Sequence, residues 1–260
     1  MLIDIGANLT HESFADDLKE VIDRAHQATV ESLIITGASI DSSVDALQLA
    51  RSQDHLFSTV GIHPHHAAEC SEQVLEQLKS LAEDSKVRAI GETGLDYFRD
   101  FCPRDRQRDA FEAQLQLAIE MNLPLFLHER DAFKDFAPIL RSYRDKLDSV
   151  VVHCFTGDRT ALQTYLDMDC YIGITGWVCD ERRGQHLHDL IELIPADRLL
   201  LETDAPYLIP RSLKEKPKNR RCEPAHLPEI CRFVAMLLNT SFEQLANQTS
   251  RNARTCFNLP

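Results

Sequence analysis

The sequence lacks the features that mark membrane and secreted proteins. Its 260 residues contain no apolar run long enough to span a bilayer. The first segment, MLIDIGANLT, has no basic region followed by a long apolar stretch, which a secretory leader requires. We therefore expect a cytoplasmic protein that has no membrane partner.

Paired cysteine motifs and a positive net charge are also missing. None of the eight cysteines forms a C-x-x-C pair, and the chain is long for a disulfide scaffold, so we expect reduced thiols. The formal net charge of -13 argues against broad nonspecific binding of nucleic acid, which needs a basic surface, but it leaves room for a local basic patch. A 43% hydrophobic content is enough for one sizeable core.

Eight short apolar runs alternate with segments of helical periodicity, and no linker, repeat or low-complexity segment divides them. The predicted strands cover residues 2–5, 32–37, 57–62, 87–90, 123–127, 150–152, 171–174 and 199–201. The predicted helices cover residues 11–28, 41–50, 74–81, 105–121, 133–147, 160–168, 184–194, 224–238 and 241–256, with Asp41 as the cap of the second. Nearly continuous apolar strands are typical of a parallel sheet covered on both faces.

Eight βα units in a chain of this length predict one α/β domain, residues 1–260, folded as a (β/α)8 TIM barrel. An open doubly wound sheet is the alternative. The chain has no G-x-G-x-x-G phosphate-binding motif, which disfavours that alternative.

The segment VRAIGETGLDYFRD places Glu92 where a buried strand ends. A carboxylate there is costly to desolvate, so we expect it to be paired, bound to metal or chemically active. Catalytic groups of a (β/α)8 barrel lie at the carboxyl ends of the strands. Other predicted strand ends carry His63, His128, His153 and Asp204, and these side chains should converge on Glu92.

Imidazole and carboxylate groups are ligands for divalent metals, and a bound cation offsets the cost of clustering them. We predict that Glu92, His128, His153 and Asp204 bind a metal ion. Asp204 can also act as a general base, and His63 can contact substrate or metal, so these two are the catalytic candidates. Any one of the histidines alone fits a structural role, and Asp204 fits a simple turn equally well.

Other polar residues near the strand ends are weaker candidates. His65 and His66 are expected to be solvated, and Arg130 to pair with Asp131 in a loop. Trp177, the only tryptophan, is expected to pack in the protein, with stacking on a base as the alternative. Basic residues gather after the last two strands: Arg182, Arg183, Arg211, Lys214, Lys216, Lys218, Arg220 and Arg221. Their place on the active side of a barrel favours phosphate contact over a merely solvated surface.

Five segments, GETGLDYFRD, LFLHERDA, VVHCFTG, YIGITGWVCDERRG and LLLETDAPYL, together resemble the TatD family of metal-dependent deoxyribonucleases. The resemblance covers residues 1–257. It implies an amidohydrolase-like TIM barrel that acts as a 3'-5' exonuclease on single-stranded DNA and RNA, with a role in DNA repair. By position, Glu92, His128 and His153 match metal ligands, Asp204 an acidic metal or catalytic residue, and His63 a histidine at the active-site mouth.

One position departs from the family pattern and bears on the metal content. Many relatives have H-x-H after the first strand, where this chain has Gly6 and Asn8, so a second metal ion should be absent or weakly held. Histidine ligands favour Zn²⁺ or Mn²⁺, whereas the resemblance implies Mg²⁺. We expect Mg²⁺, with Mn²⁺ and Zn²⁺ as alternatives, because a nucleic-acid substrate brings oxygen ligands of its own.

Two other functions fit part of this pattern. A barrel hydrolase acting on a small ester, lactone or amide would use the same ligands but would not need the basic residues. A catalytically inactive scaffold is supported only by Gly6 and Asn8. The sequence shows no large apolar seam, so we expect a monomer.

Overall fold

The computed structural model describes residues 1–260, and its centre is a ring of eight parallel strands. Neighbours in the sequence are neighbours in the sheet, from the first strand to the eighth. The strands are β1 (Leu2–Ala7), β2 (Val30–Ile35), β3 (Leu56–Val60), β4 (Val87–Asp96), β5 (Leu125–Arg130), β6 (Val150–Val152), β7 (Tyr171–Ile174) and β8 (Leu199–Leu201). This order confirms the predicted barrel, because a doubly wound sheet reverses its strand order at a switch point.

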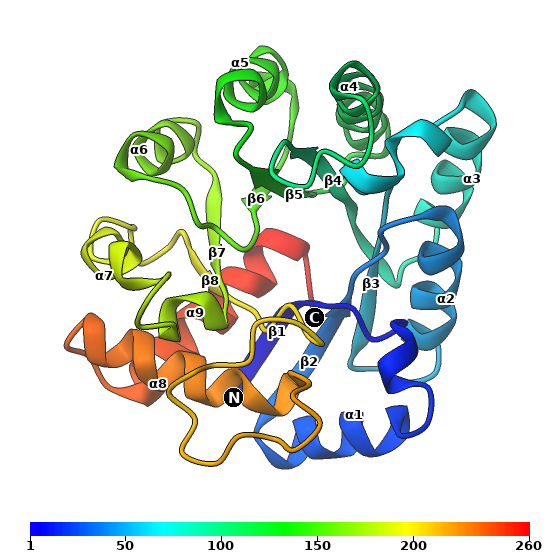
Figure 1. Ribbon diagram of the computed structural model, residues 1–260. Coiled ribbons are helices and arrows are strands. Elements are labelled where there is room, and N and C mark those ends of the chain that lie inside the picture. The colour runs from blue at the N-terminus through cyan, green and yellow to red at the C-terminus, as the bar shows by residue number, and fades with distance from the viewer.

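Helices surround the ring of strands, and the last helix of the chain passes behind the ring in this view (Figure 1). They are α1 (Leu18–Gln27), α2 (Ile40–Ala50), α3 (Glu72–Ala82), α4 (Arg104–Met121), α5 (Phe133–Tyr143), α6 (Arg159–Asp167), α7 (Gln185–Ile191), α8 (Leu227–Leu237) and α9 (Phe242–Phe257). Short 3-10 helices are η1 (Glu12–Phe14), η2 (Pro64–Glu69), η3 (Arg144–Lys146), η4 (Gly176–Cys179) and η5 (Pro224–His226). None of the helices is both long and apolar enough to cross a membrane.

Several details of the predicted helices are wrong. Residues 144–146 and 224–226 form η3 and η5, so the predicted helices 133–147 and 224–238 are each divided. The segment 11–28 is not one helix, because η1 and α1 are separated by a turn that ends at Asp17. Asp41 does not cap α2; Ser39 does, and its hydroxyl accepts the Ser42 N–H in a capping box. A short hydroxyl side chain competes for this role as well as a carboxylate does.

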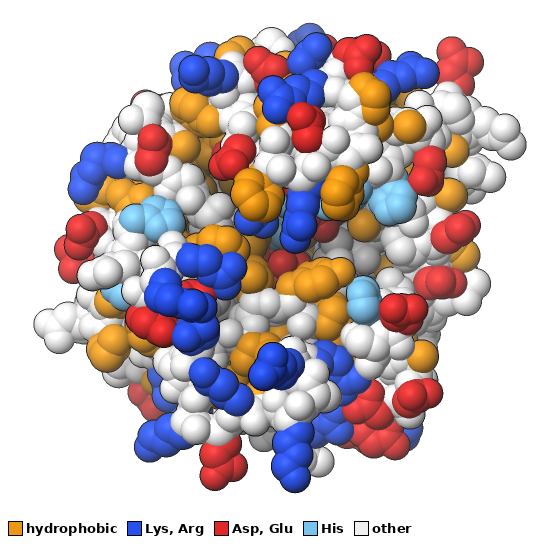
Figure 2. Space-filling view, in the orientation of Figure 1, with side chains coloured by type: hydrophobic (Ala, Val, Ile, Leu, Met, Phe, Trp, Pro, Cys, Tyr) orange, Lys and Arg blue, Asp and Glu red, His pale blue; other side chains and the backbone are white.

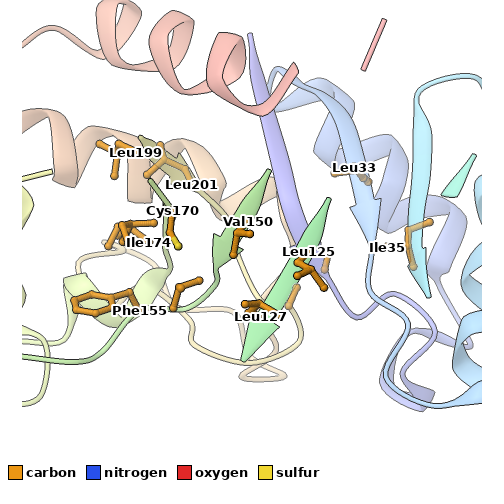
Figure 3. Packing of buried hydrophobic residues seen from close by; sticks show 14 of the residues in the cluster. Leu33, Ile35, Leu125, Leu127, Val150, Phe155, Cys170, Ile174, Leu199 and Leu201 are labelled. Atoms are coloured by element: carbon orange, nitrogen blue, oxygen red, sulfur yellow. The ribbon is translucent and has the colours of Figure 1, made fainter. Parts of the chain in front are cut away.

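Strand side chains alternate between two buried clusters. Leu125 and Leu127 of β5 belong to the larger cluster, which lies between the sheet and the helices. Figure 3 shows them beside Val150 of the next strand. Phe126, between them in sequence, points the other way and joins the smaller cluster in the barrel interior. This period of two follows from strand geometry and fills both sides of the barrel wall.

The barrel is closed between β1 and β8 by a few specific contacts. Ala7 and Ala205 form a single parallel bridge. The buried carboxylate of Asp4 accepts hydrogen bonds from the Thr203 N–H at 2.9 Å and from the Thr203 hydroxyl at 2.5 Å. These contacts place the segment after β8 beside the end of β1, at the same rim as the other strand ends.

Candidate active site

Five of the predicted residues meet in one cavity of about 670 Å³ at the carboxyl ends of the strands. His63 follows β3, Glu92 lies on β4, His128 on β5, and His153 and Asp204 follow β6 and β8. Figure 2 shows this face of the molecule as a hollow with acidic side chains at its floor. Three of the histidines thus lie around Glu92, and Asp204 lines the same cavity.

One carboxylate oxygen of Glu92 lies at the centre of the group. Its Oε1 is 2.8 Å from Nε2 of His153, 3.0 Å from Nδ1 of His128 and 3.3 Å from Nε2 of His63. The Glu92 side chain is only 8% exposed, so water cannot provide the compensation for its charge. The imidazoles provide it instead.

The backbone around Glu92 needs a glycine before it. Gly91 has a φ of +140°, and a Cβ there would lie 2.1 Å from the carbonyl oxygen of Phe126. The close approach of β4 to β5 therefore excludes any side chain at position 91. It also brings Glu92 to the inner side of the barrel mouth.

Three side chains in this group present ligand atoms within 4.8 Å of one another: His63, Glu92 and His128. His153 lies outside that set, although it contacts the same carboxylate oxygen. The sequence suggested His63 as a catalytic residue. In the structure its ring nitrogen lies close enough to the Glu92 carboxylate for both to bind one metal ion. Two imidazole nitrogens and a carboxylate oxygen form a common donor set for a divalent cation.

Unpartnered buried atoms in the site fit the same interpretation. Nδ1 of His153 and Oε2 of Glu202 are buried, lie 3.4 Å apart and form no hydrogen bond, and buried Nε2 of His128 has only Oδ2 of Asp96 beside it, at 3.4 Å. Buried polar atoms are nearly always satisfied, and exceptions concentrate where a protein binds an ion or performs chemistry. The residues present therefore fit a bound metal.

The charges of the group are strongly coupled. Burial alone would raise the pKa of Glu92, but the neighbouring imidazoles outweigh it and hold this pKa well below its usual range. Burial would lower the pKa of His153, but Glu92 and Glu202 raise it well above the ordinary value. Burial dominates for His63 and lowers its pKa to about 4, so this imidazole is neutral; its Nδ1 accepts the His65 N–H at 3.1 Å and its Nε2 faces Glu92.

Asp204 lies on the cavity wall but outside the His63–Glu92–His128 set. Its Oδ1 accepts a hydrogen bond from Nδ2 of Asn8 at 3.0 Å. Burial raises the pKa of Asp204 to about 7, despite the partly opposing charge of His153. A carboxyl group with this pKa can gain and lose a proton near neutral pH.

The structure explains why the first strand carries a glycine in place of a ligand. Glu202 is fully buried, and its Oε1 accepts the Cys154 N–H at 2.6 Å. A Cβ on Gly6 would lie 2.5 Å from Oε2 of Glu202 and 2.7 Å from Cζ of Phe126. The Glu202 carboxylate thus fills the space that a larger residue at position 6 would need.

Asp96 is a site residue that the sequence reasoning missed. Its Oδ2 is 2.9 Å from Nε2 of His65 and 3.4 Å from Nε2 of His128, and its Oδ1 accepts the Arg99 N–H at 2.8 Å. Burial opposes ionisation, but these hydrogen bonds hold the pKa of Asp96 below its usual range. The available signal was its position, since it ends the same buried strand that carries Glu92.

Two predictions about histidines and arginines near the cavity are wrong. His65 is not simply solvated: it lines the cavity and bonds to Asp96, whereas His66, which also lines the cavity, is exposed and pairs with Glu69. Arg130 does not pair with Asp131, because its guanidinium lies 4.2 Å above the Phe98 ring.

Arginines and aromatic rings alternate around the mouth. Trp177 packs against the core, as predicted, and it also lines the cavity. The guanidinium of Arg183 lies 4.4 Å from its ring centre, and that of Arg130 lies 5.4 Å away. Three arginines line the cavity, Arg99, Arg130 and Arg183. They give a site with an acidic floor a basic rim.

The basic run after β8 divides into anchored and free residues. Arg221 is 9% exposed and its guanidinium pairs with Asp17 and Glu223 at 2.7 Å, so it cannot contact a phosphate as predicted. Arg211 pairs with Glu181 at 2.8 Å. The four cations between them in sequence form no ion pair in the structure: Lys214, Lys216, Lys218 and Arg220.

Known proteins resemble this chain over its whole length. The model of the family described as TatD-related DNase matches residues 3–258. The 3'-5' ssDNA/RNA exonuclease TatD of Erwinia tasmaniensis is 51% identical over 259 residues, covering 99% of this chain and 100% of the relative. The protein of that name from Salmonella typhimurium is 46% identical over 258 residues, 99% of each chain. The crystal structure of a TatD homologue from Escherichia coli has a TM-score of 0.91 and 28% identity, covering 100% of this chain and 98% of the homologue.

Proposed function

Because this chain belongs to the family of TatD-related DNases, we propose that it is a metal-dependent 3'-5' exonuclease on single-stranded DNA and RNA. The family resemblance expected from the sequence motifs is confirmed. The observation that carries the proposal is the Glu92 carboxylate surrounded by three imidazoles in a cavity with a basic rim. A phosphodiester is an anion, and such a rim attracts it despite the net charge of the chain.

The chain's own residues have distinct roles in this proposal. His63, Glu92 and His128 would hold a divalent ion, with His153 beside the same carboxylate. When bound, the ion supplies a Lewis acid for the phosphoryl oxygens and lowers the pKa of water. We propose Mg²⁺, with Mn²⁺ and Zn²⁺ as alternatives, because the phosphate oxygens of the substrate complete the coordination that a hard ion prefers.

Proton transfer is assigned to Asp204, which has a pKa raised to about 7 and lies on the cavity wall. Its hydrogen bond from Asn8 fixes the orientation of the carboxyl group. A role of Asp204 as a further metal ligand, as the sequence motif predicts, belongs to the same proposal. The guanidinium groups of Arg99, Arg130 and Arg183 bind the phosphates.

The shape of the site favours a chain end as substrate. The cavity of about 670 Å³ is walled by loops from several strands, which suits one terminal nucleotide better than a continuous duplex. A role in DNA repair, through removal of terminal nucleotides, stays a prediction from the family resemblance.

A comparison of linear and circular single strands tests the need for an end. With a divalent metal present, the enzyme should degrade a linear single strand and leave a circular strand of the same sequence intact. Cleavage of both strands at the same rate would contradict the exonuclease assignment.

A further inference from the structure

A second pocket of about 640 Å³ lies beside the active-site cavity and shares two residues with it, Arg183 and Leu208. We call it the basic pocket. Its other lining residues are Ile209, Arg211, Lys216, Pro217, Lys218 and Arg220. Lys and Arg side chains gather beside the central hollow in Figure 2, over the segment between β8 and α8. The two pockets therefore adjoin each other at Arg183 and Leu208.

The positive charge of the basic pocket is only partly neutralised from within the protein. Arg211 and Arg183 pair with Glu181 and Asp180. Lys216, Lys218 and Arg220 are exposed and form no ion pair. Three adjacent uncompensated cations in a chain of net charge -13 repel one another, and a bound polyanion would relieve that repulsion.

The border between the two pockets has the chemistry of a single-strand surface. Arg183 belongs to both pockets, and its guanidinium lies 4.4 Å from the ring centre of Trp177, which lines the cavity. Proteins that bind single strands combine basic grooves for phosphates with aromatic and arginine planes on which bases stack. A strand that leaves the cavity at this border meets such a surface before it reaches the lysines.

We propose that the nucleotides on the 5' side of the scissile bond leave the cavity across Trp177 and Arg183 and lie in the basic pocket. There Lys216, Lys218 and Arg220 hold their phosphates. This inference rests on the proposed exonuclease function, because a 3' end in the cavity directs the rest of the strand outward. It makes the basic pocket a binding site for the single strand upstream of the bond being cut.

The proposal predicts that affinity depends on substrate length. A dinucleotide fills the cavity only, whereas a longer oligonucleotide also reaches the basic pocket. Each phosphate neutralised on a single strand contributes about 0.7 to the slope of log affinity against log salt concentration. Three contacts therefore contribute a slope of about 2 that a dinucleotide lacks.

Binding measurements test this with two matched triple variants. The first is K216A/K218A/R220A. The control is R141A/K146A/R251A, which removes the same charge from exposed residues that lie outside both pockets and form no ion pair. Both are combined with E92Q, so that binding of a labelled single strand is measured without cleavage.

We expect the first variant to lose about tenfold in affinity for the longer oligonucleotide and to show a shallower salt slope, with a smaller loss for the dinucleotide. The control should stay within about twofold of the parent. Equal losses in the two variants, or none in the first, would overturn the basic pocket as a binding site. The proposed function fails on a different result, the absence of nucleotide release by the wild-type enzyme.

Discussion

Glu92 illustrates how far a single residue can be interpreted from sequence. A charged residue at the end of an apolar run must have partners, and the barrel geometry, which brings the strand ends together, predicted that histidines from other strands surround it. Which histidines bring their ligand atoms close to one another as well as to Glu92 depends on side-chain direction and strand tilt, which no spacing rule contains. His63 is therefore in the candidate metal group, whereas His153 approaches Glu92 outside that group.

Short polar contacts at the site were the hardest part to predict. Asp96 and His65 lie beyond the ends of the apolar runs that guided the prediction, and they meet because η2 folds back over β4. The role of Gly6 was equally hidden, since it depends on the position of the Glu202 carboxylate 196 residues later.

At the residue scale, replacing Glu92 by glutamine should abolish metal binding. Glu92→Gln keeps the size of the side chain but removes the negative charge that a divalent ion needs. Addition of Mn²⁺ should raise the melting temperature of the wild type, because a ligand that binds only the folded state stabilises it. The variant should show no such rise, and its nuclease activity should fall at least about 100-fold.

The matched control is Glu76→Gln on the exposed face of α3, which should respond to Mn²⁺ like the wild type. Differential scanning fluorimetry with and without the ion is sufficient. An equal rise in melting temperature for Glu92→Gln and the wild type would show that the ion binds elsewhere.

At the scale of elements, the strands were predicted well and the helix ends poorly. Apolar runs bounded by polar residues locate strands, because a strand that is buried on both faces of the sheet consists almost entirely of apolar residues. Helix ends depend on individual hydrogen bonds, such as the one that Ser39 makes at the start of α2. The prediction of eight βα units was therefore correct, whereas the prediction of a single helix over residues 11–28 was wrong.

Arg221 joins two elements, α1 and the segment that precedes η5. Its guanidinium pairs with Asp17, at the start of α1, and with Glu223. The hydrogen bond from Arg221 lowers the pKa of Asp17 to about 2, and Arg24 and Arg221 together outweigh burial and lower that of Glu223. The basic run after β8 thus includes a structural clamp as well as free cations.

Removal of this clamp should destabilise the fold in a pH-dependent way. Arg221→Gln should lower the free energy of unfolding at pH 7 by about 2 kcal/mol, less than for a fully buried pair because Asp17 is 34% exposed. A depressed carboxyl pKa stabilises the fold above the ordinary value, near 3.9, and the effect is lost as pH falls toward 2. The difference between variant and wild type should therefore narrow below pH 4.

Denaturant unfolding at pH 7 and at pH 3 measures that difference. Arg211→Gln, which breaks a pair with the exposed Glu181, serves as control and should change stability by less than about 1 kcal/mol. A difference for Arg221→Gln that is the same at both pH values would contradict the assigned ion pairs.

At the scale of the whole molecule, α9 closes one end of the barrel, and the sequence pattern did not predict this role. Cys256 and Phe257 belong to the interior cluster together with strand residues such as Ile34 and Phe126. The periodicity of residues 241–256 predicted a helix, but it did not show that the end of this helix packs among side chains of the barrel interior. The last helix is thus part of the barrel core.

Truncation of Phe257 should therefore destabilise the whole barrel. Phe257→Ala should lower the free energy of unfolding by about 3–5 kcal/mol, the usual cost of a cavity left by a fully buried phenylalanine. Met236→Ala is the control, because Met236 is 64% exposed and should contribute less than about 1 kcal/mol. Denaturant unfolding measures the loss of stability in both variants. Equal losses for Phe257→Ala and Met236→Ala would contradict the packing of the end of α9 in the barrel interior.

The charge distribution also acts at this scale. A chain of net charge -13 has a basic rim around an acidic floor, so a local field rather than the overall charge governs approach of a nucleic acid. Composition argued against broad binding of nucleic acid and could not place the rim, because the fold sets the neighbours of Arg99, in a turn after β4, and of Arg130, at the end of β5.

The central claim is that the site around Glu92 is the active site of a metal-dependent 3'-5' exonuclease. Its most direct test is release of mononucleotides from a single-stranded oligonucleotide labelled at either end, with Mg²⁺, Mn²⁺ or Zn²⁺ added in turn. The wild type should release the 3' label first, only with a divalent metal, and Glu92→Gln should release none. Early release of the 5' label, or no release with any of the three metals from folded protein, would contradict the claim.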